Sequence, residues 1–151
     1  MNIAATQYSL STKSLDIYFS GCNAPHCKNC QNPELWEFST DNNYENEFSK
    51  ISEKVKTFST LIDNIMLFGG EPLDQNYVEL CDFIDKLKTL DKMIYLFTRY
   101  DLNKIPDYIK NLCNYIKTGR YIPSLTVDNN IQYGITLATS NQHINKQGID
   151  Y

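Results

Sequence analysis

Hydrophobic and polar residues follow two different spacings along the chain. Short apolar runs rich in β-branched and aromatic residues indicate strands, and longer segments with an apolar residue every three or four positions indicate amphipathic helices. The runs predict strands at residues 15–20, 64–68, 93–98, 114–117 and 131–138. The helical spacing predicts helices at 41–62, 74–90 and 102–112, the last interrupted near Pro106. Strands separated by helices of this length predict right-handed βαβ units and a mostly parallel sheet.

The composition fits one folded domain that spans residues 1–151. Hydrophobic residues make up 42% of the 151 residues, and glycine and proline are sparse, which indicates a globular protein. No repeat, low-complexity tract or linker divides the sequence. We therefore expect a single α/β domain with an open, mostly parallel sheet or a partial (β/α) barrel.

Charge and hydropathy exclude several classes of partner. The net charge is −4 without a block of like charges, so we expect no nucleic-acid binding through a basic face. No apolar run approaches the roughly 18 residues of a membrane span, and the N-terminal segment lacks the pattern of a secretion signal. Five cysteines are an odd number, which argues against a closed disulfide framework. These features predict a cytoplasmic protein with reduced thiols.

Polar motifs follow four of the predicted strands. In parallel α/β folds, ligands bind at the carboxyl ends of the strands. We therefore expect these four segments to project from one rim of the sheet. They are the cysteine-containing loop after residue 20, Gly69-Gly70-Glu71-Pro72, Thr98, and Thr118-Gly119.

The loop after the first predicted strand holds Cys22, Cys27 and Cys30 within nine residues. This spacing can place three thiolates around one metal centre, whereas structural zinc sites and ordinary four-iron clusters take four protein ligands. A three-thiolate cluster leaves one iron open for chemistry. Zinc with His26 as a fourth ligand remains an alternative, although His26 directly precedes Cys27. The other two cysteines, Cys81 and Cys113, are expected to be small core residues.

The Gly69-Gly70-Glu71-Pro72 turn is suited to a close approach of backbone to ligand. Glycine has no Cβ, so it admits positive φ and leaves space beside the chain. Carbonyls exposed at the strand end can accept from an ammonium group, and Glu71 adds a further acceptor. A simple strand-to-helix turn would explain the same residues, but the three-cysteine loop one βα unit earlier favours a ligand site.

The combination resembles the radical S-adenosylmethionine (SAM) superfamily, and within it the activating enzymes of glycyl-radical enzymes. It is most similar to the activases of anaerobic (class III) ribonucleotide reductase. The resemblance runs from about Leu15 to Ile144. Its segments are IYFSGCNAPHCKNCQNPELW, LFGGEPL, YLFTRY, IKTGRYI and TSNQHI. The usual cysteine spacing of that superfamily is Cys-x3-Cys-x2-Cys, and this chain has one more residue in the first gap.

The resemblance implies two cofactors and a set of residues that bind them. Cys22, Cys27 and Cys30 would ligate a [4Fe-4S] cluster, and the amino and carboxylate groups of SAM would occupy the fourth iron. Such chemistry requires no general base, so no acid–base catalytic residue is assigned. The residues expected to bind SAM are Gly69, Gly70 and Glu71 at its amino end, Asn29, Cys30 and Gln31 at its adenine, and Thr98 and Thr118 at its ribose or carboxylate.

The resemblance also implies an activity and partners. A flavodoxin or ferredoxin would supply one electron, SAM would be cleaved to a 5′-deoxyadenosyl radical, and that radical would take a hydrogen atom from a glycine of a partner enzyme. The partner would be anaerobic ribonucleoside-triphosphate reductase. One alternative is a radical SAM enzyme for a small molecule such as a nucleoside or modified-base precursor. Another is a non-enzymatic zinc or electron-transfer module.

Overall fold

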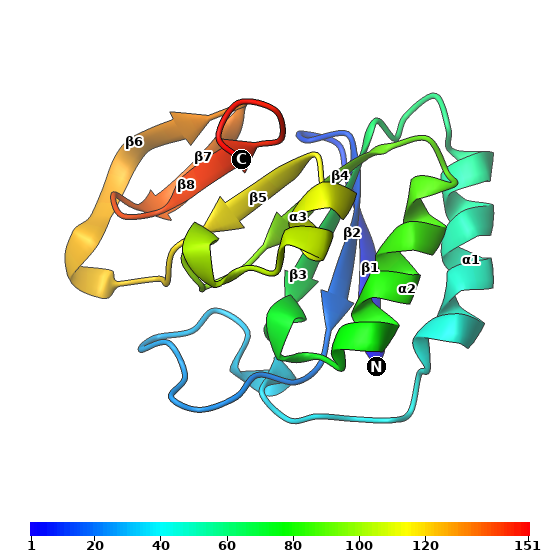
Figure 1. Cartoon of the computed structure of the whole chain (residues 1–151), viewed down its shortest axis with the longest axis horizontal. Coiled ribbons are helices and arrows are strands. Elements are labelled where there is room, and N and C mark those ends of the chain that lie inside the picture. The colour runs from blue at the N-terminus through cyan, green and yellow to red at the C-terminus, as the bar shows by residue number, and fades with distance from the viewer.

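A six-stranded sheet forms the centre of the computed structural model, which describes residues 1–151 (Figure 1). Its order is β1-β2-β3-β4-β5-β8, with the four central strands parallel and both outer strands antiparallel to their neighbours. The strands are β1 (Ile3–Ser9), β2 (Ser14–Phe19), β3 (Asn64–Gly69), β4 (Met93–Phe97), β5 (Tyr115–Thr118) and β8 (His143–Lys146). A separate hairpin contains β6 (Thr126–Gln132) and β7 (Ile135–Thr139).

Three α-helices pack on one face of this sheet: α1 (Tyr44–Thr57), α2 (Tyr77–Lys88) and α3 (Asp107–Leu112). Asparagine side chains cap the first two, because Asn43 accepts from the N–H of Glu45 and Asn76 accepts from those of Val78 and Glu79. Four short 3₁₀ helices complete the connections. These are η1 (Pro33–Leu35), η2 (Pro72–Asp74), η3 (Leu102–Lys104) and η4 (Pro123–Leu125).

The two faces of the sheet bury different side chains. Alternate strand residues, such as Ile17, Leu67 and Leu96, are fully buried in the aliphatic core beneath the helices. Residues one position further along point to the other face, where Tyr18 stacks on Phe68 with ring centroids 5.5 Å apart. The helix-covered face therefore holds the main core, and the aromatic face is available to a site.

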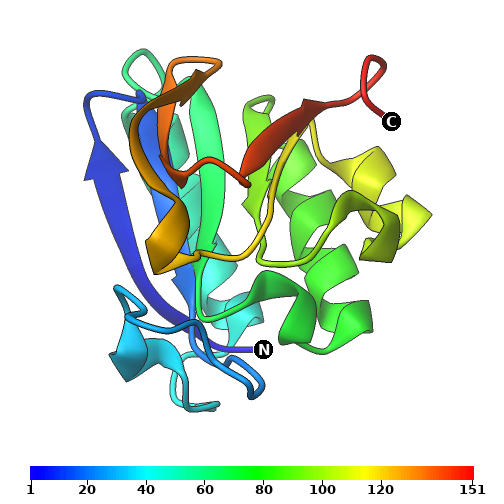
Figure 2. The same cartoon turned by 90° about the vertical axis from the view of Figure 1, so that its left-hand side faces the viewer.

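The hairpin of β6 and β7 covers part of the aromatic face, on the side of the sheet away from the helices (Figure 2). Its Tyr133 ring lies 5.1 Å from that of Tyr115 on β5. The strand predicted at 131–138 is wrong in its boundaries, because Tyr133 and Gly134 form a turn inside it. Both residues have positive φ, at 49° and 75°, which reverses the chain between two antiparallel strands.

Seven of the eight predicted elements match elements of the structure, with ends that differ by up to five residues. The helix predicted at 102–112 is divided at Pro106 into η3 and α3, as its sequence indicated. Three strands, β1, β6 and β8, were not predicted. The strands β1 and β8 lie at the edges of the main sheet and β6 lies in the hairpin, and all three contain exposed polar residues, which dilute the apolar pattern.

An open, mostly parallel sheet is confirmed, whereas a partial barrel is not. The sheet ends in antiparallel strands on both sides, and β1 and β8 are its edges rather than neighbours across a closure. Three helices accompany it. No helix is both long enough and apolar enough to cross a membrane.

Candidate iron–sulfur site

The carboxyl ends of the four parallel strands surround one cavity of about 280 Å³. In Figure 1 these strand ends face the blue loop that follows β2. The cavity is lined by that loop, by the turns after β3 and β4, by the end of β5, and by β7 with the turn after it. The expected convergence of the four segments on one rim is therefore confirmed.

All three cysteines of the loop line this cavity, and none forms a disulfide. Cys22 is 9% exposed, while Cys27 and Cys30 are half-buried. Burial raises the pKa of the Cys22 thiol to about 11, with the charge of Arg99 partly opposing the shift. Three thiols therefore face one space, with the first more deeply buried than the others.

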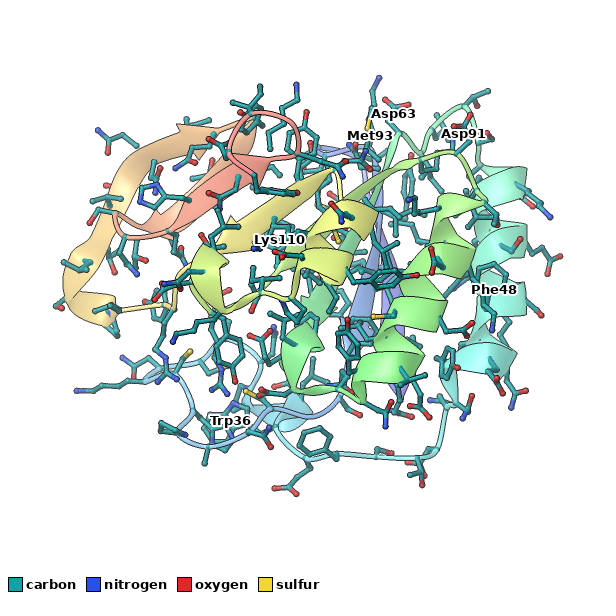
Figure 3. All side chains as sticks on the ribbon, viewed as in Figure 1. Trp36, Phe48, Asp63, Asp91, Met93 and Lys110 are labelled. Carbon is teal, nitrogen blue, oxygen red and sulfur yellow. The ribbon has the colours of Figure 1, made fainter.

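The cysteine loop begins and ends side by side. The N–H of Gly21 donates to the carbonyl of Leu35 at 2.8 Å, and that of Cys22 donates to Trp36 at 2.9 Å. Trp36 lies in this loop below the strand ends in Figure 3. Its indole stacks on the imidazole of His26, with centroids 4.0 Å apart and planes 2° from parallel. These contacts close residues 22–36 into a compact loop beside the cavity.

The glycine turn after β3 packs directly on the start of that loop. The N–H of Gly70 donates to Phe19 at 2.9 Å, and that of Glu71 donates to Gly21 at 2.8 Å. A Cβ on Gly70 would lie 2.2 Å from the Gly21 carbonyl oxygen and 2.8 Å from that of Leu35. Glycine is thus required at position 70 by the packing of backbone on backbone. The Gly70 carbonyl has no hydrogen-bond donor from the protein.

The Glu71 side chain connects the ends of β3 and β4. It is 2% exposed. One carboxylate oxygen accepts from the Thr98 hydroxyl at 2.6 Å and from the Leu73 N–H at 3.0 Å, and the other accepts from the Arg99 N–H at 2.8 Å. Burial raises the pKa of Glu71, and these three donors oppose that shift. The Glu71 carboxylate is therefore fully used in hydrogen bonds within the protein, and it links the end of β3 to the end of β4. The glycines of the turn line the cavity.

A lysine supplies positive charge at the end of β5. Lys117 lines the cavity, and its ammonium donates to the Gly119 carbonyl at 2.7 Å. Burial lowers the pKa of this ammonium to about 8, against the opposing charge of Glu71. No carboxylate forms an ion pair with it. The cavity therefore contains a cation that an anionic group of a ligand could approach.

The far wall of the cavity comes from the C-terminal part of the chain. Gln142 is 5% exposed, and its side-chain amide oxygen Oε1 accepts from the backbone N–H groups of Ala138 and Thr139 at 3.1 and 3.2 Å. These bonds hold the end of β7 over the aromatic face. Leu137 and Ala138 then contribute an apolar surface opposite the cysteines.

The structure gathers eight of the ten residues that the sequence assigned to cofactor binding. Asn29 does not line the cavity; its side chain is exposed, and its φ is 57°. Thr118 does not line it either, because its hydroxyl donates to the His143 carbonyl at 3.4 Å and accepts from Asn145 at 3.0 Å, both on β8. The eight residues on the cavity are Cys22, Cys27, Cys30, Gln31, Gly69, Gly70, Glu71 and Thr98.

Sequence reasoning missed several cavity residues. Phe68, Phe97 and Lys117 occupy the aromatic face near the strand ends, and Tyr121 and Leu137 approach from the later segments. The alternation of side chains between the two faces of a strand could have predicted that Phe68, Phe97 and Lys117 lie on this face. Phe68 pairs in register with Tyr18, and Phe97 with Lys117, so the four side chains share one face.

The chemistry of this cavity fits an iron–sulfur cluster. Three unpaired thiols converge on it, and two buried N–H donors beside them, Trp36 Nε1 and Arg99 Nε, have no hydrogen-bond partner. N–H donors near cluster sulfurs are among the features that set a cluster's potential.

The structure does not show a Cys3His zinc set. His26 is engaged elsewhere, because its Nε2 lies 2.9 Å from the Cys22 carbonyl oxygen and its ring stacks on Trp36. The three thiols are also not gathered around one point, as a single ion would require. A cluster binds its thiolates at separate iron corners, so it holds them farther apart than a single ion does.

Comparison with known proteins agrees with this chemistry. The profile of a family described as a 4Fe-4S single cluster domain matches residues 13–144. No curated protein matches the sequence significantly. The match extends from the start of β2 into β8 and contains all three cysteines of the loop. The chain therefore belongs to the family of 4Fe-4S single cluster domains, a radical-SAM-associated family.

Proposed function

We propose that the protein is a radical SAM activase, which cleaves S-adenosylmethionine reductively and thereby produces a glycyl radical on a partner enzyme. The observation that carries this proposal is the meeting of a three-thiol loop and a Gly-Gly turn in one cavity. Three thiols leave one iron of a four-iron cluster without a protein ligand, and the turn presents backbone acceptors beside that position.

Different residues of the chain would bind the cluster and SAM. Cys22, Cys27 and Cys30 would ligate the cluster. When bound, it would supply the single electron that cleaves the sulfonium of SAM. The free carbonyl of Gly70 suits the ammonium group of SAM, and the ammonium of Lys117 suits its carboxylate.

The aromatic face suits the apolar portion of the ligand. Phe68 and Phe97 lie side by side, with ring centroids 4.2 Å apart, and both line the cavity. A flat ring can lie against such a surface, and water is excluded from the space it covers. Excluding water and orienting the sulfonium are the protein's contributions, because the cofactors perform the electron transfer.

The mouth of the cavity favours a protein loop as the substrate. Gln31 and Thr136 line it and are exposed, so the site opens to solvent between the cysteine loop and the hairpin. A glycine loop of a large partner, such as anaerobic ribonucleotide reductase, could enter this opening.

The experiment is an anaerobic assay of the iron- and sulfide-reconstituted protein with dithionite and SAM. We expect 5′-deoxyadenosine and methionine, and an electron paramagnetic resonance signal of a glycyl radical only when the partner reductase is added. Flavodoxin or ferredoxin should replace dithionite as the reductant. The Cys27→Ser variant is the matched control and should produce neither compound.

Two results would redirect the proposal. Stimulation of SAM cleavage by a nucleoside alone, with transfer of label into that nucleoside, would favour the small-molecule alternative. A colourless protein that retains zinc after reconstitution would contradict cluster binding and support the zinc module.

A further inference from the structure

A buried ion pair ties the cysteine loop to the ends of the neighbouring strands. The Arg99 guanidinium, just after β4, lies 2.8 Å from the Asp74 carboxylate in η2. Their side chains are 8% and 3% exposed. Both residues also bond to the loop: Arg99 donates to the Pro25 carbonyl at 2.9 Å, and Asp74 accepts from the Asn23 N–H at 2.7 Å.

These bonds hold the part of the loop between Cys22 and Cys27. Asn23 and Pro25 lie in the gap between the first two cysteines, where the chain has no secondary structure. A second guanidinium, that of Arg120, donates to the same Pro25 carbonyl at 3.0 Å from the segment after β5. The loop between Cys22 and Cys27 is thus fixed from three separate strand ends.

The arrangement of Arg99 itself is almost fully determined. Its backbone N–H is held by Glu71, its Nη2 group also approaches the Tyr100 hydroxyl at 3.3 Å, and Tyr100 in turn donates to Asp74 at 2.6 Å. Its Nε–H makes no hydrogen bond and lies 3.9 Å from the Glu71 carboxylate, and the side chain lines the cavity that contains the cysteines. The guanidinium offsets the carboxylates of Asp74 and Glu71, 2.8 and 3.9 Å away, so its removal would leave uncompensated negative charge beside the cavity.

We propose that Arg99 and Asp74 form a clamp that positions Cys22 and Cys27 for the cluster, and that the Arg99 charge raises the cluster's reduction potential. Both are positioning residues, because they act through the loop and the local field. The inference rests on cluster binding by the cysteines and is independent of SAM cleavage.

The two parts of the clamp can be separated by substitution. Arg99→Met removes both the bonds and the charge, whereas Arg99→Lys keeps a positive charge but loses the planar fork that reaches Pro25 and Asp74 together. Asp74→Asn keeps the shape of the side chain and removes its charge. Arg120→Met is the comparison variant, because it removes a donor to the same carbonyl and leaves the Arg99–Asp74 pair in place.

The first measurement is the release of iron from the reconstituted proteins to a chelator, followed by absorbance. We expect release to be about 10- to 100-fold faster in Arg99→Met and Arg99→Lys, the usual range for loss of a group that orients metal ligands. Asp74→Asn should also release iron faster than wild type, and Arg120→Met, which keeps the buried pair, should have a smaller effect than either Arg99 variant. Release from both Arg99 variants at the wild-type rate would overturn the clamp.

The second measurement is the midpoint potential of the cluster in an anaerobic dithionite titration. We expect a lower potential for Arg99→Met and a potential near that of wild type for Arg99→Lys. Equal potentials in all three proteins would overturn the role of the charge. These readouts do not use SAM, so the clamp can fail while the proposed activity stands, and the reverse also holds.

The third measurement uses the metal-free protein. Hydrogen exchange of residues 22–36 should be faster in Arg99→Lys and Asp74→Asn than in wild type, with exchange in α1 and α2 unchanged. This result would support the clamp even if Arg99→Met fails to fold, which far-UV circular dichroism would show. Unchanged exchange in the loop would contradict it.

Discussion

The two ends of the sheet are built from the same strands but stabilise their polar groups in opposite ways. At the carboxyl end, Asp74 and Arg99 form a pair 2.8 Å apart that is almost completely buried. At the amino end, Lys13 and Asp63 lie 3.7 Å apart, and their side chains are 66% and 59% exposed. Asp63, Asp91 and Met93 all appear at that end in Figure 3, far from Trp36.

This difference indicates where the fold holds a defined geometry. Buried charges require partners in fixed positions, because each unpaired one is costly to remove from water. Exposed pairs are screened and contribute little. The carboxyl end therefore carries polar residues that the stability of the core alone does not need, and these residues surround the three thiols.

The largest effect should come from the thiols themselves. Changing Cys22, Cys27 or Cys30 to serine removes one of only three protein ligands, so the reconstituted variant should lose most of its iron and its absorbance near 400 nm. Iron and sulfide analysis after anaerobic reconstitution measures this. Cys81→Ser is the control, because Cys81 lies in the core cluster away from the cavity. A brown, iron-replete Cys27→Ser variant would show that another residue completes the site.

The next effect should appear in folding stability. Glu71→Ala leaves the Thr98 hydroxyl and the N–H groups of Leu73 and Arg99 without their acceptor and removes a buried charge next to Arg99. We expect a loss of about 3 to 5 kcal/mol in the free energy of unfolding, as for one partner of a buried pair. Urea denaturation of the metal-free protein provides the value.

The amino end supplies the control for that measurement. Asp63→Ala removes the exposed partner of Lys13 and should change the free energy of unfolding by at most about 0.5 kcal/mol. Equal losses for Glu71→Ala and Asp63→Ala would remove the distinction between the two ends of the sheet.

The sequence predicted this contrast in part. The position of the site followed from strand periodicity, because the carboxyl ends of parallel strands must meet at one edge. The sequence did not predict that the Glu71 carboxylate bonds to groups of the protein, since its bonds to Thr98 and Arg99 depend on how the ends of β3 and β4 approach each other in space. The orientation of Thr118 toward β8 was equally hidden, because β8 itself was not recognised.

A smaller loss of stability should follow from crowding of the glycine turn. Gly70→Ala would place its Cβ 2.2 Å from the Gly21 carbonyl oxygen, and neither backbone segment can move without disturbing the loop. We expect about 1 to 3 kcal/mol of destabilisation and faster hydrogen exchange in residues 22–36. Gly134→Ala is the comparison, since a Cβ there meets nothing within 4 Å and only the positive φ of 75° is unfavourable. That variant should leave exchange in the cysteine loop unchanged.

The smallest and most local effect concerns the order in which the thiols react. In the metal-free protein, Cys22 is buried and its pKa is raised to about 11, so little of it is thiolate at pH 8. Cys27 and Cys30 are half-buried and accessible from the cavity. Iodoacetamide should therefore label Cys22 about 10- to 100-fold more slowly than the other two, as measured by peptide mass spectrometry. Raising the pH from 8 to 10 should accelerate Cys22, because a larger fraction is then ionised. Labelling of all three cysteines at one rate would contradict this prediction. It would mean that the hydrogen bonds of the cysteine loop do not persist in the metal-free protein in solution.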